Sequence, residues 1–340
     1  MITARSRTAR IALLGAFGAL LIAGLALVSG CSDSVAAPGI GSSAQTTDAL
    51  AVLPRDADVY GMTNLAEARD SQALSAALGG TGLGMVSGNG SADFDEFMRL
   101  TGFDPNEDLD RVYVAAREGQ PKRAAFVAYG RFDRQRIEQY VADQTEVAFE
   151  VSDIDGVPVY LTTSEDGERG GFALANNEMV LAGDEATLAD MIRRLGTTVG
   201  TPDAELQALF DRVHYPDGAW FVARGFDRAG LQVPDDAPPS AMAARAAEGF
   251  VVSMSFEGDG IPVRAFLKTK PEASTDDVAD VVRGGISAAR IGMKDQPSAL
   301  DVLDRVEVEA EGEGVRVEGF LTTAFLADAH ISSKDGSGRH

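Results

Sequence analysis

The feature that most limits how this chain can be stabilised is its single cysteine, Cys31, among 340 residues. One thiol cannot form an intrachain disulfide, so the folded state must be held by a hydrophobic core alone. Core material is plentiful, because 45% of the residues are hydrophobic. The cysteine also stands at a particular place, directly after an apolar run from Ile11 to Val28 that follows a basic N-terminus.

The N-terminus has the three parts of an export signal: a basic start without acids, the apolar run, and small residues before a cleavage position. The sequence Val28-Ser29-Gly30-Cys31 resembles the lipobox of bacterial lipoproteins, which usually has leucine where this chain has Val28. The resemblance implies that residues 1–30 are a signal peptide cut before Cys31. It also implies that Cys31 is the lipid attachment site, with a diacylglyceryl group on sulfur and often an acyl group such as palmitate on the new amine.

Two alternatives remain open for this region. The apolar run of about 18 residues is near the lower limit for a membrane span, so it could stay as an uncleaved helix. Cys31 could also be an unmodified thiol.

Residues 31–47, rich in Ser, Ala, Gly and Thr, are predicted to form a flexible tether. Two or more acyl chains hold a protein firmly at a membrane, whereas one chain does so only marginally. We therefore expect a lipid-anchored protein of the cell envelope, attached to the membrane through Cys31. Ser32 follows the cysteine, and resemblance to sorted lipoproteins favours the outer membrane if the organism has two membranes.

The chain is strongly acidic, with a formal net charge of −22 at pH 7. Removal of residues 1–30 takes away three arginines and no acid, which leaves 27 basic against 52 acidic residues, a charge of −25. Such a chain is not expected to bind nucleic acid, because that binding depends on basic side chains that neutralise phosphates. Adhesion to anionic lipid through basic segments is excluded on the same ground.

Hydrophobic patterning predicts an α+β fold of two related halves, residues 48–215 and 216–330, each a largely antiparallel sheet with helices packed on one face. Residues 305–321 alternate apolar and polar side chains around a Gly312-Glu313-Gly314 turn, which is typical of a hairpin. The order strand, hairpin, helix, hairpin occurs twice, with a period of about 150 residues. In this repeat the strands near 149–162 of the first half correspond to the hairpin at 305–321 of the second. The tail, residues 331–340, is predicted to be disordered.

For two of the predicted helices the sequence also indicates where the helix begins or ends. The helix at 185–195 has Asp184 as its N-cap and Gly196 as its C-cap. The next helix is predicted to begin at Thr201-Pro202, because proline suits a first helical position.

Several short motifs are similar to those of uncharacterised exported bacterial proteins, over residues 50–325. They include Thr101–Pro105, Gly130–Asp133 and Leu181–Asp184. The resemblance implies the two-half α+β architecture and carries no activity. The motifs themselves are interpreted as turns, caps and strand starts.

Two motifs suggest ligand loops and are assigned to structure instead. The run at 79–90, GGTGLGMVSGNG, lacks the Lys-Ser/Thr of a phosphate cradle and is predicted to be a flexible loop. Alternate acidic or amide residues resemble the start of a calcium loop, but positions six and twelve carry Leu109 and Ala115 in place of Gly and Glu. We therefore predict a turn before a strand at Asp104, Asn106, Asp108 and Asp110.

Catalytic and metal chemistry has few candidates. Of three histidines only His214 is placed to serve a metal or a Ser-His-Asp triad, and no GxSxG elbow accompanies it. Aromatic residues early in the second half are expected in the core, with a ligand pocket between the halves as the alternative: Trp220, Phe221 and Phe226. Four acids are expected to form a solvated sheet face, with docking of a basic partner as the alternative: Glu307, Glu309, Glu311 and Glu318.

The sequence therefore predicts a non-catalytic envelope lipoprotein without cofactor or metal, which binds a partner protein or an apolar ligand. One alternative is a carboxylate-dependent hydrolase, which requires carboxylates of shifted pKa that converge in a pocket. The other is a passive structural lipoprotein of the surface.

Overall fold

The computed structural model describes residues 43–77, 92–117, 124–144, 149–163, 167–197, 203–226 and 242–328. These residues form two compact units. The N-terminal unit contains the described parts of residues 31–69 and 83–202, and the C-terminal unit those of residues 70–82 and 203–340. The predicted signal peptide, Cys31, the glycine-rich run at 79–90, the dipeptide Thr201-Pro202 and the tail at 331–340 lie outside the described residues.

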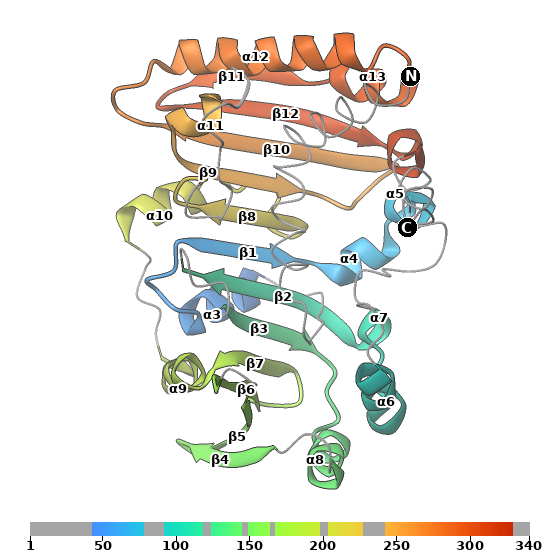
Figure 1. Cartoon of the computed structure of the whole chain (residues 1–340), viewed down its shortest axis with the longest axis vertical. Coiled ribbons are helices and arrows are strands. Elements are labelled where there is room, and N and C mark those ends of the chain that lie inside the picture. The colour runs from blue at the N-terminus through green and yellow to red at the C-terminus, as the bar shows by residue number, and fades with distance from the viewer. Residues whose placement is uncertain are drawn as a thin grey trace. The chain divides into compact units, whose positions relative to one another are not determined.

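The N-terminal unit is built on an antiparallel sheet of seven described strands (Figure 1). Each strand pairs with its neighbour in an antiparallel register. The spatial order is β1 (Val59–Thr63), β2 (Leu109–Ala116), β3 (Ala125–Gly130), β7 (Met179–Asp184), β6 (Arg169–Leu174), β5 (Val157–Thr163) and β4 (Glu150–Ile154).

Helices cover both faces of this sheet. Neighbouring residues of a strand point to opposite faces, and on β7 both Val180 and Leu181 are buried. Val180 belongs to a core cluster with Ile137 and other residues of one face, whereas Gly183, on the face of Leu181, lies against Thr187. The helices of this unit are α3 (Ser43–Val52), α4 (Leu65–Asp70), α6 (Ala92–Thr101), α7 (Pro105–Asp108), α8 (Arg134–Asp143) and α9 (Glu185–Arg194).

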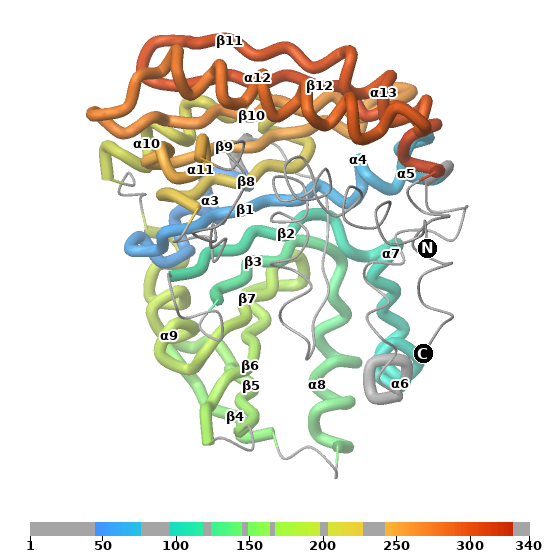
Figure 2. The backbone as a smooth tube through the Cα atoms, turned by 45° about the horizontal axis from the view of Figure 1, so that its top comes forward, coloured from blue at the N-terminus to red at the C-terminus, as the bar shows by residue number. Residues whose placement is uncertain are grey.

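The C-terminal unit has an antiparallel sheet of five described strands. Their order is β11 (Glu307–Glu311), β12 (Gly314–Thr322), β10 (Gly260–Thr269), β9 (Ala247–Met254) and β8 (Ala219–Ala223). Its helices are α5 (Gln72–Ala77), α10 (Ala204–Phe210), α11 (Met242–Ala246), α12 (Thr275–Gly292) and α13 (Pro297–Asp304). The backbone trace in Figure 2 follows the same path through both units.

The long helix α12 lies along the terminal strand β11 (Figure 1). The guanidinium of Arg283, on this helix, donates a hydrogen bond of 2.8 Å to the backbone carbonyl of Val308. Helix α10 packs on the sheet, with the Leu209 side chain close to Gly249. The rings of Phe210 and Trp220 also contact each other edge to face, with centroids 5.5 Å apart. Trp220 shares its face with Arg264 and Arg316, opposite the buried face of Val315 and Val317.

The α+β class with antiparallel sheets is confirmed, and the placement of the helices needs a correction. The prediction put them on one face of each sheet, whereas the structure has helices on both faces. The cause is visible on β9, where every residue from Gly249 to Ser253 is buried. A strand whose side chains are buried on both faces of the sheet needs packing elements on both faces. A strand in which apolar and polar residues alternate needs them on one face only.

Three predicted boundaries also differ from the structure. Residues 43–47 of the predicted tether belong to α3, which begins at Ser43. The helix expected from Thr201-Pro202 is described from Ala204, because the Asp203 carboxylate accepts from Leu206 N–H at 3.1 Å and caps it there. The units divide between residues 202 and 203 rather than 215 and 216, since α10 packs on β8 and β9.

The motifs interpreted as caps and turns have those roles. Asp184 caps α9 and Gly196 follows it with φ +71°. Asp104 caps α7, where its carboxylate accepts from Asn106 N–H at 2.8 Å. Asp108 in turn accepts from Asp104 N–H at 2.8 Å. Asp104 and Asp108 thus hold a single helical turn directly before β2, whereas Asp110 already lies in that strand.

Asp184 gives a direct test of the capping argument. Its carboxylate accepts from the Thr187 N–H at 3.0 Å and from the Thr187 hydroxyl at 2.7 Å. Asp184→Ala is expected to lower the free energy of unfolding by about 1 kcal/mol, and Asp184→Asn by much less. The control is Asp190→Ala on the same helix, since Asp190 is exposed and makes only surface ion pairs, with Arg193 and Arg194. Equal effects of the two alanine variants in denaturant unfolding would contradict the capping role.

Within the part of the chain that the structure describes, no helix has both the length and the apolar character required to span a bilayer.

Candidate functional site

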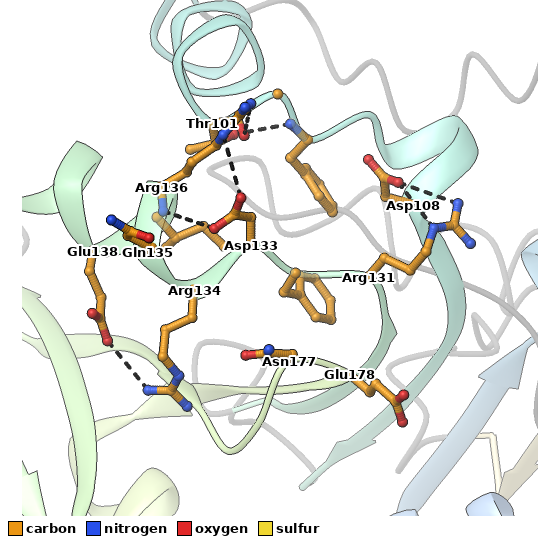
Figure 3. A pocket seen from close by; sticks show the side chains of 14 residues that line it. Thr101, Asp108, Arg131, Asp133, Arg134, Gln135, Arg136, Glu138, Asn177 and Glu178 are labelled. Carbon is orange, nitrogen blue, oxygen red and sulfur yellow. Dashed lines mark hydrogen bonds and ion pairs between the residues drawn. The ribbon is translucent and has the colours of Figure 1, made fainter.

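A depression of about 800 Å³ opens in the N-terminal unit, around the first turn of α8 (Figure 3). We call it the α8 pocket. Its lining comes from three places: the end of α6 and the following turn (residues 101–103) with Asp108, residues 131–138, and Asn177 and Glu178 in the turn between β6 and β7. These segments are far apart in the sequence.

Backbone contacts hold these segments together. The Arg131 N–H donates to the Asp108 carbonyl at 2.7 Å, and the Phe132 N–H donates to the Asn177 carbonyl at 2.9 Å. The rings of Phe103 and Phe132 stack with centroids 5.7 Å apart and planes inclined by 20°. The two motifs interpreted as structural, Thr101–Pro105 and Gly130–Asp133, therefore form one wall of the pocket.

Three arginines surround the pocket, and each faces a carboxylate (Figure 3). The nitrogen–oxygen distances are 3.3 Å for Arg131 and Asp108, 3.4 Å for Arg134 and Glu138, and 3.4 Å for Arg136 and Asp133. Charge-assisted bonds of this kind are strongest near 2.7–2.9 Å. The side chains of Arg131 and Arg136 are both 60% exposed, so these two pairs contribute little to stability.

Glu138 and Arg134 are held from the inside of the unit. The Tyr160 hydroxyl donates to Glu138 Oε1 at 3.1 Å, and Arg134 Nη2 donates to the Leu174 carbonyl at 2.5 Å. Burial, followed by the negative charge of Glu138, raises the pKa of Tyr160 to about 12, so the phenol keeps its proton. The Arg134–Glu138 pair is therefore held in place at the N-terminal end of α8.

The pocket was not predicted from the sequence, although a signal for it exists. Three arginines within six residues, Arg131 to Arg136, directly follow a strand in a chain that is otherwise acidic. A local excess of guanidinium groups indicates a place that handles polar or charged groups. The sequence does not show that Asn177 and Glu178 lie close to these arginines in the folded chain.

His214, the histidine considered for a metal site or a Ser-His-Asp triad, lies beside Arg264 and Ser253. It is exposed, its Nδ1 lies 2.9 Å from Arg264 Nη1, and its backbone N–H donates to Ser253 Oγ at 3.2 Å. Among the described residues, no group of three or more His, Cys, Asp or Glu side chains is arranged to hold a metal ion. Partial burial, and then the positive charge of Arg264, hold the pKa of His214 below its usual value.

This depressed pKa predicts a pH effect on stability. Because the unfolded chain binds the proton more readily, the contribution of neutral His214 is complete above pH 6.5, the usual pKa, and is lost as the pH falls through the folded-state pKa. His214→Gln keeps an acceptor for Arg264 but does not titrate. We expect its unfolding free energy to fall less steeply below pH 6.5 than that of the parent chain. Equal slopes in chemical denaturation across that range would contradict this.

The predicted acidic sheet face is a mixed network of ion pairs. Arg316 lies among Glu309, Glu311 and Glu318, with 3.0 Å between its Nε and a Glu311 oxygen. Glu311 also pairs with Arg212 at 2.7 Å. The alternation of glutamates along β11 was read correctly, but their cross-strand arginine neighbours were overlooked, so the face is less negative than expected.

The aromatic residues of the second half are core residues, as predicted. Trp220, Phe221 and Phe226 are buried, and Phe221 and Phe226 both stack on Phe250, with centroids 5.6 and 4.3 Å from it.

No protein-family model matches this chain, and no curated protein matches it. Among solved structures, the chain is similar to TP0453. Crystal form IV of that protein has a TM-score of 0.49 and 14% identity, over 85% of this chain and 99% of that one. Form III has a TM-score of 0.49 and 13% identity, over 84% and 98%. A likeness of this size concerns the path of the chain and carries no functional information.

Proposed function

We propose that this chain is a lipid-anchored protein of the cell envelope that binds a ligand in the α8 pocket without transforming it. The observation that carries binding over catalysis is the engagement of three of the four pocket carboxylates, all except Glu178. Asp133 caps α8 through the Arg136 N–H at 3.1 Å, Asp108 accepts from the Asp104 N–H, and Glu138 accepts from Tyr160. A general acid or base must exchange its proton with a substrate, and these carboxylates already serve the fold.

The anchoring half of the proposal depends on the sequence. The lipobox-like Val28-Ser29-Gly30-Cys31 lies outside the described residues, so its support is the order of a basic start, an apolar run and a lone cysteine. An acidic chain of this kind has no electrostatic affinity for an anionic bilayer. Acyl chains on Cys31 would supply the attachment.

The character of the pocket favours a polar ligand, or a polar segment of a partner protein, over the apolar ligand that the sequence suggested. Its lining combines three arginines and four acids with two phenylalanines and Ile137. A wholly apolar molecule would bury these charged groups without offering them hydrogen bonds, which is costly.

A site-specific crosslink in intact cells tests the proposal. A photoreactive residue replaces Gln135, which is exposed and lines the pocket, or Gln72, an exposed residue of α5 that serves as the control. The expected result is the same adduct in repeated experiments with the Gln135 derivative and its absence with the Gln72 derivative. Equal capture at both positions, or capture at neither, would contradict a binding site at α8. Turnover of the captured molecule by the purified protein would overturn the non-catalytic part.

A further inference from the structure

The α8 pocket has hydrogen-bonding capacity that its own ion pairs do not use. A guanidinium has five N–H donors and a carboxylate about four acceptor positions. At separations of 3.3–3.4 Å, each pair in the pocket is longer than the best charge-assisted bond. A ligand atom that donates to the carboxylate and accepts from the guanidinium can therefore join both partners of a pair.

The charges of the pocket select against an anion. Arg131, Arg134 and Arg136 each have a carboxylate beside them, and Glu178 adds one more negative charge to the lining. A phosphate or carboxylate that approached any of these guanidiniums would meet a like charge next to it. A neutral ligand with many hydroxyl groups meets no such repulsion and can both donate and accept.

The remaining lining suits a molecule with one apolar face and a polar rim. Phe103 is half-buried and provides the accessible apolar surface, whereas Phe132 and Ile137 are buried in the core. The amides of Gln135 and Asn177 are exposed at the rim. A sugar ring has this construction, since its axial C–H bonds form an apolar face and its hydroxyls lie around the edge. The cavity of about 800 Å³ is within the range of small-molecule sites.

We propose that the α8 pocket binds a neutral saccharide, with Phe103 against one face of a sugar ring and the paired arginines and carboxylates on its hydroxyls. This inference rests on the proposed function, because it names the ligand class of the same binding site. Asn177 and Gln135 are the residues of choice for a test. Both are exposed, and the structural bond of Asn177 is made by its backbone carbonyl, which alanine keeps.

The experiment is calorimetric titration of the full lipidated chain in detergent micelles. The probes are two neutral oligosaccharides, a tetramer of N-acetylglucosamine and maltotetraose, with inorganic phosphate and trialanine as comparators. We expect at least one saccharide to bind, and the double variant Gln135→Ala/Asn177→Ala to weaken that binding about tenfold, the loss expected for one or two hydrogen bonds. The control variant Gln72→Ala is expected to bind like the parent.

Binding that the double variant does not change would overturn the inference, as would the absence of binding by either saccharide. A preference for phosphate or trialanine that the double variant abolishes would also overturn it, while the proposed binding function would stand. If no probe binds and the crosslink at Gln135 also captures nothing, the saccharide assignment and the proposed function both fail.

Discussion

Replacement of Cys31 by serine is expected to abolish lipid attachment and to leave the chain with its N-terminal signal in place. The change replaces one sulfur atom by oxygen, alters no charge, and concerns a residue outside the part of the chain that the structure describes. Resemblance to bacterial lipoproteins implies that the thiol accepts the diacylglyceryl group and that cleavage precedes the modified residue. Without the thiol, both steps should stop. Each buried methylene of an acyl chain is worth about 0.8 kcal/mol, so the lost affinity for the membrane is large.

The decisive measurements are incorporation of labelled fatty acid and the mass of the N-terminal peptide. Fractionation alone is a weaker test, because an uncleaved apolar run of about 18 residues could itself remain in a bilayer. Ser29→Ala is the matched control, since it keeps the cysteine and a small residue before it. We expect this control to be labelled and processed like the parent. A serine variant at position 31 that is still labelled, or still processed, would contradict the lipid anchor.

The second large effect is expected at Gly130, the last residue of β3. A Cβ at this position would overlap the backbone carbonyl oxygen of Asp108 and stand 3.1 Å from the Cα of Leu109. Both atoms belong to the main chain where α7 ends and β2 begins, and main-chain atoms cannot rotate away as a flexible side chain would. Gly130→Ala is therefore expected to lower the free energy of unfolding by about 3 kcal/mol, the upper part of the usual range for overpacking. The measurement is chemical denaturation of the full chain.

Gly284 provides the matched control, because the same substitution should have the opposite sign there. Gly284 lies within α12, and a Cβ at this position meets no atom within 4 Å. Alanine lowers the cost of ordering the backbone in a helix, so Gly284→Ala is expected to raise the free energy of unfolding by about 0.5–1 kcal/mol. Loss of stability in both variants would show that the effect at Gly130 does not arise from close packing.

The sequence predicted the elements well where the information was local. The cap Asp184 was placed correctly, because this side chain and the Thr187 N–H that it accepts from are only three residues apart. The hairpin of β11 and β12 was also legible, since its turn and its alternation lie within about 17 residues, as expected of a two-stranded unit. Such features require no knowledge of distant parts of the chain.

The order of the strands was less accessible. The last hairpin of the second half was matched with the strands near 149–162, which are β4 and β5. In the N-terminal unit, however, β7 is the strand that pairs with β3, as β12 pairs with β10 in the C-terminal unit. The hairpin of β6 and β7 thus holds the equivalent position. In the N-terminal unit two hairpins, β4–β5 and β6–β7, follow β3 along the chain. Their order in the sequence does not tell which of them pairs with β3.

The α8 pocket was missed for a similar reason. The motifs around Phe103 and Phe132 were recognised as structural, but their proximity depends on the register of β2 and β3. Leu109 pairs with Gly130, and an irregularity between Leu109 and Arg111 shifts the pairing that follows. This register brings Asp108 beside Arg131. A shift of one residue would have turned these side chains to the other face, and the sequence pattern alone does not fix it.

The bond between Arg283 and Val308 has a consequence for molecules held close together. A terminal strand with open carbonyls can recruit a strand from a neighbour and so begin aggregation. In the C-terminal unit, one such carbonyl already accepts a guanidinium, and a helix of 18 residues runs beside the strand. If the chain is held on a lipid surface as proposed, its copies would collide often, and at Val308 this strand would offer one backbone acceptor fewer to a neighbouring strand.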